Sequence, residues 1–153
     1  MPIKSDIEFR SVLDKLPIPK QREMAARFTA SVAMLSTDPR IMTALNAARH
    51  ANISDSELKL IHQTAKSACV ESYTQCGKET NWLSQAGHFV CEAAKCCVKA
   101  AEPGHNLAWD AAMNARMART FETIAKGEGT QNREADLQYK MMDEDVTRES
   151  TGA

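Results

Sequence analysis

The sequence predicts an all-α fold, a single-domain bundle of about six to seven helices with alanine-rich close packing. The first observation is that ten alanines fall within residues 86–118, mostly three, four or seven positions apart, as on one helix face. The second is that no segment alternates apolar and polar residues as a half-buried strand does. Because alanine favours helices and lets a neighbouring backbone approach, we expect interaxial distances near the lower end of the usual ~8–10 Å. The ten alanines are Ala86, Ala93, Ala94, Ala100, Ala101, Ala108, Ala111, Ala112, Ala115 and Ala118.

The length and the composition suit one domain. A chain of 153 residues can bury a sizeable core without disulfides or metals. Aromatic residues make up only 5%, so the core must be built mainly from Ala, Leu, Ile, Val, Met and Cys. We therefore treat residues 1–153 as a single helical domain. Residues 1–19 are expected to form an N-terminal helix and a proline-rich turn, and residues 147–153 are expected to fray.

The first two helices are predicted from a capping pattern and an apolar period. Ser5 and Glu8 form a capping box that begins a helix over residues 5–15. The Pro-Ile-Pro sequence of residues 17–19 ends this helix, because proline cannot continue one. A second helix is predicted over residues 21–36. Its apolar residues at helical spacing are Met24, Phe28, Val32 and Leu35.

The third and fourth helices begin at recognisable caps. Asp38, followed by proline, begins a helix that ends near His50. Ser54 and Glu57 form a second capping box, which begins a long helix with Gly77 as its C-cap. The stripe of this helix that we expect to face the core is Leu58, Ile61, Ala65, Ala68, Cys69, Ser72 and Cys76.

Three more helices complete the predicted fold. Thr80 or Asn81 caps a fifth helix, which ends before the Glu-Pro-Gly loop of residues 102–104. A sixth helix over residues 106–126 has apolar residues on more than half of its circumference, so we expect it to be central. A last helix covers residues 133–146. The predicted core face of the fifth helix is Trp82, Ala86, Phe89, Ala93, Cys97 and Ala100.

The charge balance and the hydropathy pattern narrow the function classes. The formal net charge of −1 argues against a general nucleic-acid binder, which needs a basic excess to neutralise phosphates. The uncharged stretch over residues 81–91 is far shorter than the ~20 residues that cross a bilayer, so we expect no membrane association. The first residues are polar and do not resemble a signal peptide, which favours a cytoplasmic location.

The cysteines allow two interpretations. Their number is five, and two of them are adjacent, which does not fit the disulfide framework of a secreted domain. Because no CxxC motif is present, we expect small buried side chains without a metal or cofactor. The alternative is a helical thiol or metal protein that binds copper or zinc. Its ligands would come from Cys69, Cys76, Cys91, Cys96 and Cys97.

The sequence contains no specific catalytic motif. There is no HExxH, GxSxG, GxGxxG or P-loop pattern, and no pair of helical ExxH motifs of the di-iron kind. We therefore assign no catalytic residue and expect that the protein is not an enzyme. The four histidines, which we expect to be solvated or hydrogen-bonded, are His50, His62, His88 and His105.

Two arginines interrupt the apolar surface of the predicted sixth helix. Glu122 lies three residues after Arg119, so an intrahelical ion pair is expected. Glu134 or Asp136 of the last helix could instead pair with Arg119 or with Arg116. Either arrangement is structural, since isolated charge pairs on helices usually belong to the scaffold.

The C-terminal part of the chain is acidic and is the candidate partner-binding surface. From residue 128 onward acidic residues outnumber basic ones by seven to three. Such a surface would attract and steer a basic protein partner, and a solvated helix face is the alternative. The candidate residues are Glu128, Glu134, Asp136, Asp143, Glu144 and Asp145.

Three segments of the chain, in this order, resemble a known family. They are LPIPKQREMAARFTASVAML, DPRIMTALNAARHANISDSELKLIHQTAKSA and READLQYKMMDED, and they span residues 16–145. Together with the alanine-spaced helices between them, they resemble the bacterial immunity proteins of the Imm5 type. The resemblance implies a small helical protein of a polymorphic-toxin system, which binds and neutralises a cognate toxin. It supplies no catalytic residues.

The sequence thus favours a non-enzymatic protein-binding module, with an immunity protein as the specific expectation. Two alternatives remain: the thiol or metal protein described above, and a structural module that forms homo-oligomers. An interior lined by alanine leaves little room for a cofactor between the fifth and sixth helices. We therefore expect the binding surface on the outer faces or at the turns.

Overall fold

The computed structural model describes residues 2–78 and 81–150, and these ranges are helical without any strand. This result confirms the predicted all-α bundle of six to seven helices. The described elements are α1 (Asp6–Asp14), α2 (Ile18–Ala30), the 3-10 helix η1 (Ala33–Leu35), α3 (Arg40–Arg49), α4 (Asp55–Lys78), α5 (Trp82–Val98), α6 (Leu107–Ala125) and α7 (Glu134–Ser150).

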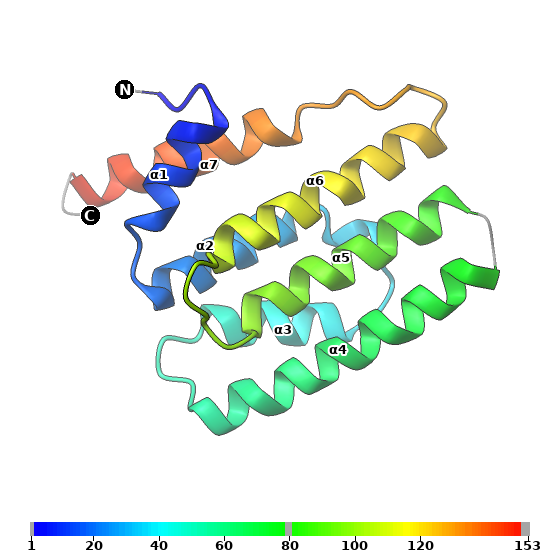
Figure 1. The fold of residues 1–153 in the computed structure, drawn as a ribbon, viewed down its shortest axis with the longest axis horizontal. Coiled ribbons are helices and arrows are strands. Elements are labelled where there is room, and N and C mark those ends of the chain that lie inside the picture. The colour runs from blue at the N-terminus through cyan, green and yellow to red at the C-terminus, as the bar shows by residue number, and fades with distance from the viewer. Residues whose placement is uncertain (1, 79–80, 151–153) are drawn as a thin grey trace.

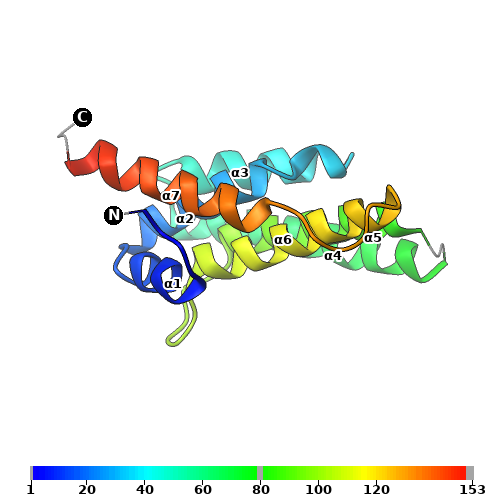
Figure 2. The same ribbon diagram turned by 90° about the horizontal axis from the view of Figure 1, so that it is seen from above.

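The helices form two layers and an edge. Helices α4, α5 and α6 lie side by side in one layer, and α2, η1 and α3 pack behind it (Figures 1 and 2). Helices α1 and α7 lie along the outer edge of α6. Helix α6 therefore contacts α1, α2, α5 and α7, as expected for a central helix. In Figure 1 the front of α4 and α5 faces the viewer with no described helix across it.

Helices α5 and α6 form the most extensive helix pair of the described chain, and eight of the ten alanines that the sequence analysis singled out are buried on these two helices. Ala100 and Ala101 are the exceptions, because α5 ends at Val98 and leaves both of them exposed in the following loop. The assignment of Ala100 to the core face of the fifth helix was wrong. The other eight of the ten alanines are fully buried: Ala86, Ala93, Ala94, Ala108, Ala111, Ala112, Ala115 and Ala118.

A second core cluster ties α1 and α7 to α2 and α6. The ring of Phe9 lies 5.6 Å from that of Phe28, 6.0 Å from Trp109 and 5.2 Å from Tyr139, measured between centroids. The guanidinium of Arg116 covers Phe9 from 5.6 Å. Elements more than a hundred residues apart in the chain are therefore held together by one aromatic side chain.

The predicted helix over residues 21–36 was wrong at both ends. Helix α2 begins at Ile18, because Pro17 is the N-cap and Pro19 lies in the first turn, where a missing N–H costs nothing. It ends at Ala30, and residues 33–35 form a 3-10 turn instead. Gly87 permits this turn to pack on α5, since a Cβ there would lie 3.1 Å from the Leu35 carbonyl oxygen.

Other boundaries differ less from the expectation. Helix α4 continues to Lys78, so Gly77 lies inside its last turn and is not the C-cap. Asn81 caps α5 through a 2.8 Å hydrogen bond from the Leu83 N–H, whereas Thr80 lies outside the described residues. Helix α7 continues to Ser150, past the predicted end at residue 146; residues 151–153 also lie outside the described ranges.

The helices of the described residues are at most 24 residues long. None of them combines the length and the apolar character that crossing a bilayer requires.

Candidate functional site

The aromatic side chains divide into two groups. The chain contains four phenylalanines, two tryptophans and two tyrosines. Half of them form the buried cluster around Phe9: Phe9, Phe28, Trp109 and Tyr139. The other half belong to α4, α5 and α6: Tyr73, Trp82, Phe89 and Phe121.

His88 joins the second group into a continuous line of five rings, which we call the ring row (Tyr73, His88, Phe89, Phe121 and Trp82). From Tyr73 on α4 the ring centroids step 5.8 Å to His88 and 5.5 Å to Phe89, both on α5. The row then steps 5.3 Å to Phe121 on α6 and 5.6 Å back to Trp82 at the start of α5. The last two contacts are stacked, with interplanar angles of 18° and 15°. The row therefore spans all three helices of the layer.

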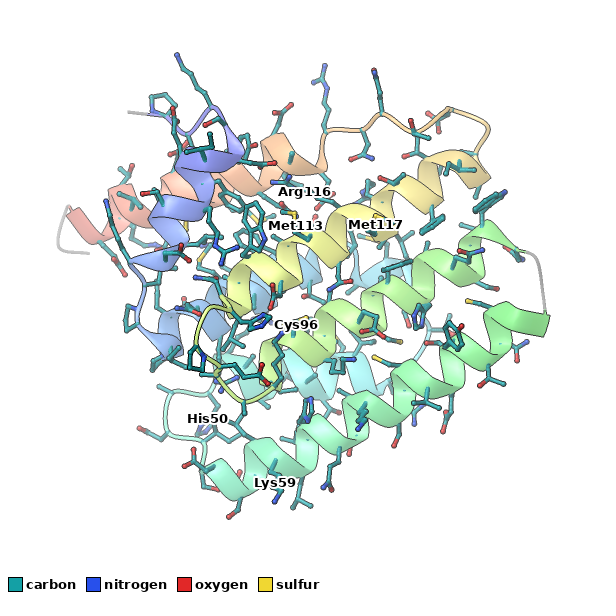
Figure 3. The ribbon with its side chains drawn as sticks, viewed as in Figure 1. His50, Lys59, Cys96, Met113, Arg116 and Met117 are labelled. Atoms are coloured by element: carbon teal, nitrogen blue, oxygen red, sulfur yellow. The ribbon has the colours of Figure 1, made fainter. Side chains whose placement is uncertain are left out.

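Solvent reaches both ends of the ring row. Tyr73 is 71% exposed and Trp82 47% exposed, which is unusual for such large rings in an aromatic-poor chain. Val70, 59% exposed, lies one turn before Tyr73 on α4, and Met117, 41% exposed, lies one turn before Phe121 on α6 (Figure 3). Aromatic residues and methionine are enriched in protein interfaces, so this surface has the composition of a binding site.

His88 is fixed in the middle of the row by neighbours on both ring nitrogens. Its Nδ1 lies 2.8 Å from the Ser72 hydroxyl, and its Nε2 lies 3.6 Å from the Glu92 carboxylate. The Ser72 hydroxyl also donates to the Cys69 carbonyl within α4 at 3.0 Å. Ser72 and His88 are residue types of a hydrolase triad, and which of them donates in their hydrogen bond depends on the ring tautomer. Burial lowers the pKa of His88, which keeps the ring neutral at pH 7.

Four of the five cysteines are buried apolar residues. The Cys97 thiol donates to the Ala93 carbonyl at 3.4 Å, and burial raises the pKa of Cys97 to about 12. Burial also raises the pKa of Cys69, Cys91 and Cys96, so these thiols are protonated at neutral pH and are weak nucleophiles. Cys76 is half-buried. Among residues 2–78 and 81–150, no three His, Cys, Asp or Glu side chains meet in a group that could hold a metal ion.

The acidic C-terminal residues are only partly available to a partner. Glu128, Asp136 and Glu144 are exposed, as the partner-binding prediction requires. Asp143 is half-buried, and its carboxylate accepts the Ile3 N–H at 3.1 and 3.2 Å. This contact ties the N-terminal segment to α7, so Asp143 has a structural task as well.

Glu134 and Asp145 point inward, and their assignment to a partner-binding surface was wrong. Glu134 is 2% exposed; it accepts a hydrogen bond from Arg119 at 2.9 Å and one from the Ser31 hydroxyl at 2.6 Å. Asp145 is fully buried and pairs with Lys20 at 2.8 Å and, more loosely, with Arg27 at 3.7 Å. Both carboxylates hold α7 against the bundle.

The two arginines of α6 are structural, as the sequence indicated. Arg119 pairs with Glu122 at 2.6 Å and with Glu134, so both predicted kinds of partner are used. Arg116 forms a two-pronged contact of 2.9 and 3.1 Å with Asp6 of α1, a partner that the sequence did not suggest. Its Nε donates to Gln138 of α7 at 2.8 Å.

No family, curated protein or solved structure matches this chain. The function is therefore inferred from the side chains of this molecule, and the ring row is its candidate site.

Proposed function

We propose that this chain is a protein-binding module without catalytic activity, and that the ring row is its docking surface. The observation that carries the proposal is the division of the aromatic residues: half of them lie in a partly exposed row although only 5% of the chain is aromatic. Exposed apolar surface of this kind marks interaction sites. Tryptophan and tyrosine are also the residue types that most often dominate binding free energy.

Within this class we propose the role of an immunity protein, which binds and neutralises a toxin. The support is the resemblance of three sequence segments to the Imm5 type, together with a surface suited to protein contact. The thiol and metal alternative has weaker support, because burial keeps Cys69, Cys91, Cys96 and Cys97 protonated.

The test is co-expression with the toxin encoded next to this chain in its genome. The wild-type protein should co-purify with the toxin and protect the producing cells. A Tyr73→Ala/Trp82→Ala variant should bind at least tenfold more weakly, because truncating an interface hot spot costs about 2 kcal/mol or more.

A matched control distinguishes the ring row from apolar surface in general. Ile7 and Leu137 are also exposed, at 85% and 41%, but they lie on α1 and α7. An Ile7→Ala/Leu137→Ala variant should bind the toxin as the wild type does. Absence of both co-purification and protection would overturn the proposal, and so would equal loss in the two variants. Light scattering could instead show that the wild type is a dimer and that only the Tyr73→Ala/Trp82→Ala variant is a monomer. In that case the partner is a second copy of this chain.

A further inference from the structure

A groove runs between α4 and α5 beside the ring row. Its volume is about 370 Å³, and its walls come from two neighbouring antiparallel helices (Figure 1). Tyr73 and His88 of the ring row form part of it, so groove and row make one continuous surface. The lining residues are Lys66, Cys69, Val70, Tyr73, His88, Glu92 and Lys95.

The two ends of the groove differ in chemistry. Tyr73 and His88 form an aromatic end, with their ring centroids 5.8 Å apart. Lys66 of α4 and Lys95 of α5 stand at the other end. Since Tyr73 and Lys66 are seven residues apart on one face of α4, the two ends are separated by about 10.5 Å, or two helical turns.

The lysine end carries a net positive charge. Lys95 pairs with Glu92 at 2.9 Å, whereas Lys66 forms no ion pair with any described residue. The pKa of the neighbouring His62 reflects this positive charge. Burial is the largest cause that lowers this pKa. The positive charges of Lys95, Lys66, Lys99 and Arg22 lower it further. Lys99 forms its own ion pair with Asp110 at 2.7 Å.

We infer that the groove binds an acidic amphipathic helix of the protein partner. Apolar side chains of that helix pack on Tyr73, and its carboxylates face Lys66 and Lys95. The inference rests on the proposed protein-binding function and adds the chemistry of the partner. In the docking helix, the apolar anchor and the acidic residue lie about seven positions apart, which places both on one face.

The probe is a synthetic helical peptide with leucine and glutamate seven positions apart on one face. A control peptide has lysine in place of each glutamate. Each is titrated into the full chain, labelled with ¹⁵N, and amide shifts are followed by NMR, which detects weak binding as well as strong. The acidic peptide should shift the amides around Lys66, Tyr73, His88 and Lys95, and raised salt should weaken its binding. The basic peptide should bind at least tenfold more weakly.

Charge-reversal variants provide the decisive comparison. Lys66→Glu/Lys95→Glu should lower the affinity for the acidic peptide at least tenfold. Lys4→Glu/Lys140→Glu changes the net charge equally at exposed positions of the N-terminal segment and α7, and it should leave the affinity unchanged. Equal binding of both peptides, shifts away from the groove, or equal effects of the two variants would each overturn the inference. Single-stranded DNA that shifts the lysine amides more strongly than the acidic peptide does would assign the groove to a polyanion instead.

The two proposals fail separately. If the toxin co-purifies through the ring row and Lys66→Glu/Lys95→Glu binds it normally, the acidic-helix inference is wrong and the function stands. If the acidic peptide binds in the groove but no toxin is bound or neutralised, the immunity role is wrong and the groove chemistry stands.

Discussion

The residues Glu134, Gln138, Met142 and Asp145 are all buried and recur along one side of α7. This stripe has the period of a helix face, yet three of its four members are polar. Each polar member has a partner elsewhere in the bundle: Arg119 for Glu134, Arg116 for Gln138 and Lys20 for Asp145. The buried face of α7 is therefore defined by polar contacts to α2 and α6.

Removing the Asp145 carboxylate should be costly because of these contacts. Asp145→Ala leaves Arg27 without this carboxylate and leaves Lys20 with Glu23 and Glu149, each at 3.2 Å. We expect a loss of about 2–3 kcal/mol in the free energy of unfolding, below the full cost of breaking a wholly buried pair. Urea denaturation measures it. Asp136→Ala, an exposed position on the same helix, should change stability by less than about 0.5 kcal/mol.

The inward direction of Glu134 and Asp145 could not be predicted from the sequence. Hydrophobic periodicity detects a buried face only when that face is apolar, and three of the four buried residues of this stripe are polar. A buried carboxylate is recognised by its cationic partner, and Lys20 lies more than a hundred residues away from Asp145. By contrast, the Arg119–Glu122 pair was predicted, because its spacing is local.

At the scale of the element, helices that begin with a capping box were predicted better than the boundaries of α2. Ser5 accepts the Glu8 N–H and Ser54 the Glu57 N–H, so both predicted capping boxes are helix caps. Helix α2 was misjudged because its first turn contains proline, a residue that ends helices but also begins them. The 3-10 turn after it depends on contact with Gly87 of α5, which no local pattern reveals.

The close contact of α5 with α6 should tolerate no added volume. Ala111→Leu inserts three carbons at a fully buried position, and we expect a loss of about 1–3 kcal/mol from overpacking. Thermal unfolding followed by circular dichroism measures this loss. Ala100→Leu adds the same volume in the exposed loop after α5 and should be nearly neutral. Equal effects would show that alanine at position 111 is no packing requirement.

Arg116 joins three elements, so its replacement should loosen two of them. In Arg116→Lys the fork that binds Asp6 and the Nε contact to Gln138 are lost, while the charge remains. We expect a loss of about 1 kcal/mol, since Asp6 is half-exposed. Hydrogen exchange should become faster in α1 and α7 but not in α4. Unchanged exchange in α1 would rule out this role of Arg116.

At the scale of the whole molecule, stability should decline as the pH falls below neutrality. Burial lowers the pKa of His62 and of His88 below the ordinary value of 6.5, so the unfolded chain binds protons at a higher pH than the folded one. The stability that the neutral rings contribute is complete above about pH 7 and is lost as the pH falls from 6.5 toward the folded pKa values.

Urea denaturation at pH 7.5 and at pH 5.5 tests this expectation. The wild type should be less stable at pH 5.5, and His88→Gln should lose part of that difference. The carboxyl groups with lowered pKa, those of Asp6, Asp38, Glu71 and Glu122, affect stability only below this range. An unchanged pH dependence in His88→Gln would contradict the assignment to His88.

The ring row could be predicted only in part. Trp82 and Phe89 lie seven residues apart and were placed on one face of the fifth helix. The predicted face is buried at Ala86, Ala93 and Cys97, whereas Trp82 at its start is 47% exposed. Which part of α5 stays uncovered depends on contacts between distant segments. The contact between Tyr73 and His88 exists because α4 packs against α5, and the sequence pattern did not predict this pairing.

The division of the rings also separates the two tryptophans. Trp82 is half-exposed and stacks on Phe121, whereas Trp109 packs against Phe9 among α1 and α6. Each is therefore an intrinsic fluorophore for a different region: the emission of Trp82 follows events at the ring row, and that of Trp109 follows the docking of α1. Replacing either one by phenylalanine leaves a chain with a single emitter, in which ligand binding and the detachment of α1 are recorded as separate optical signals.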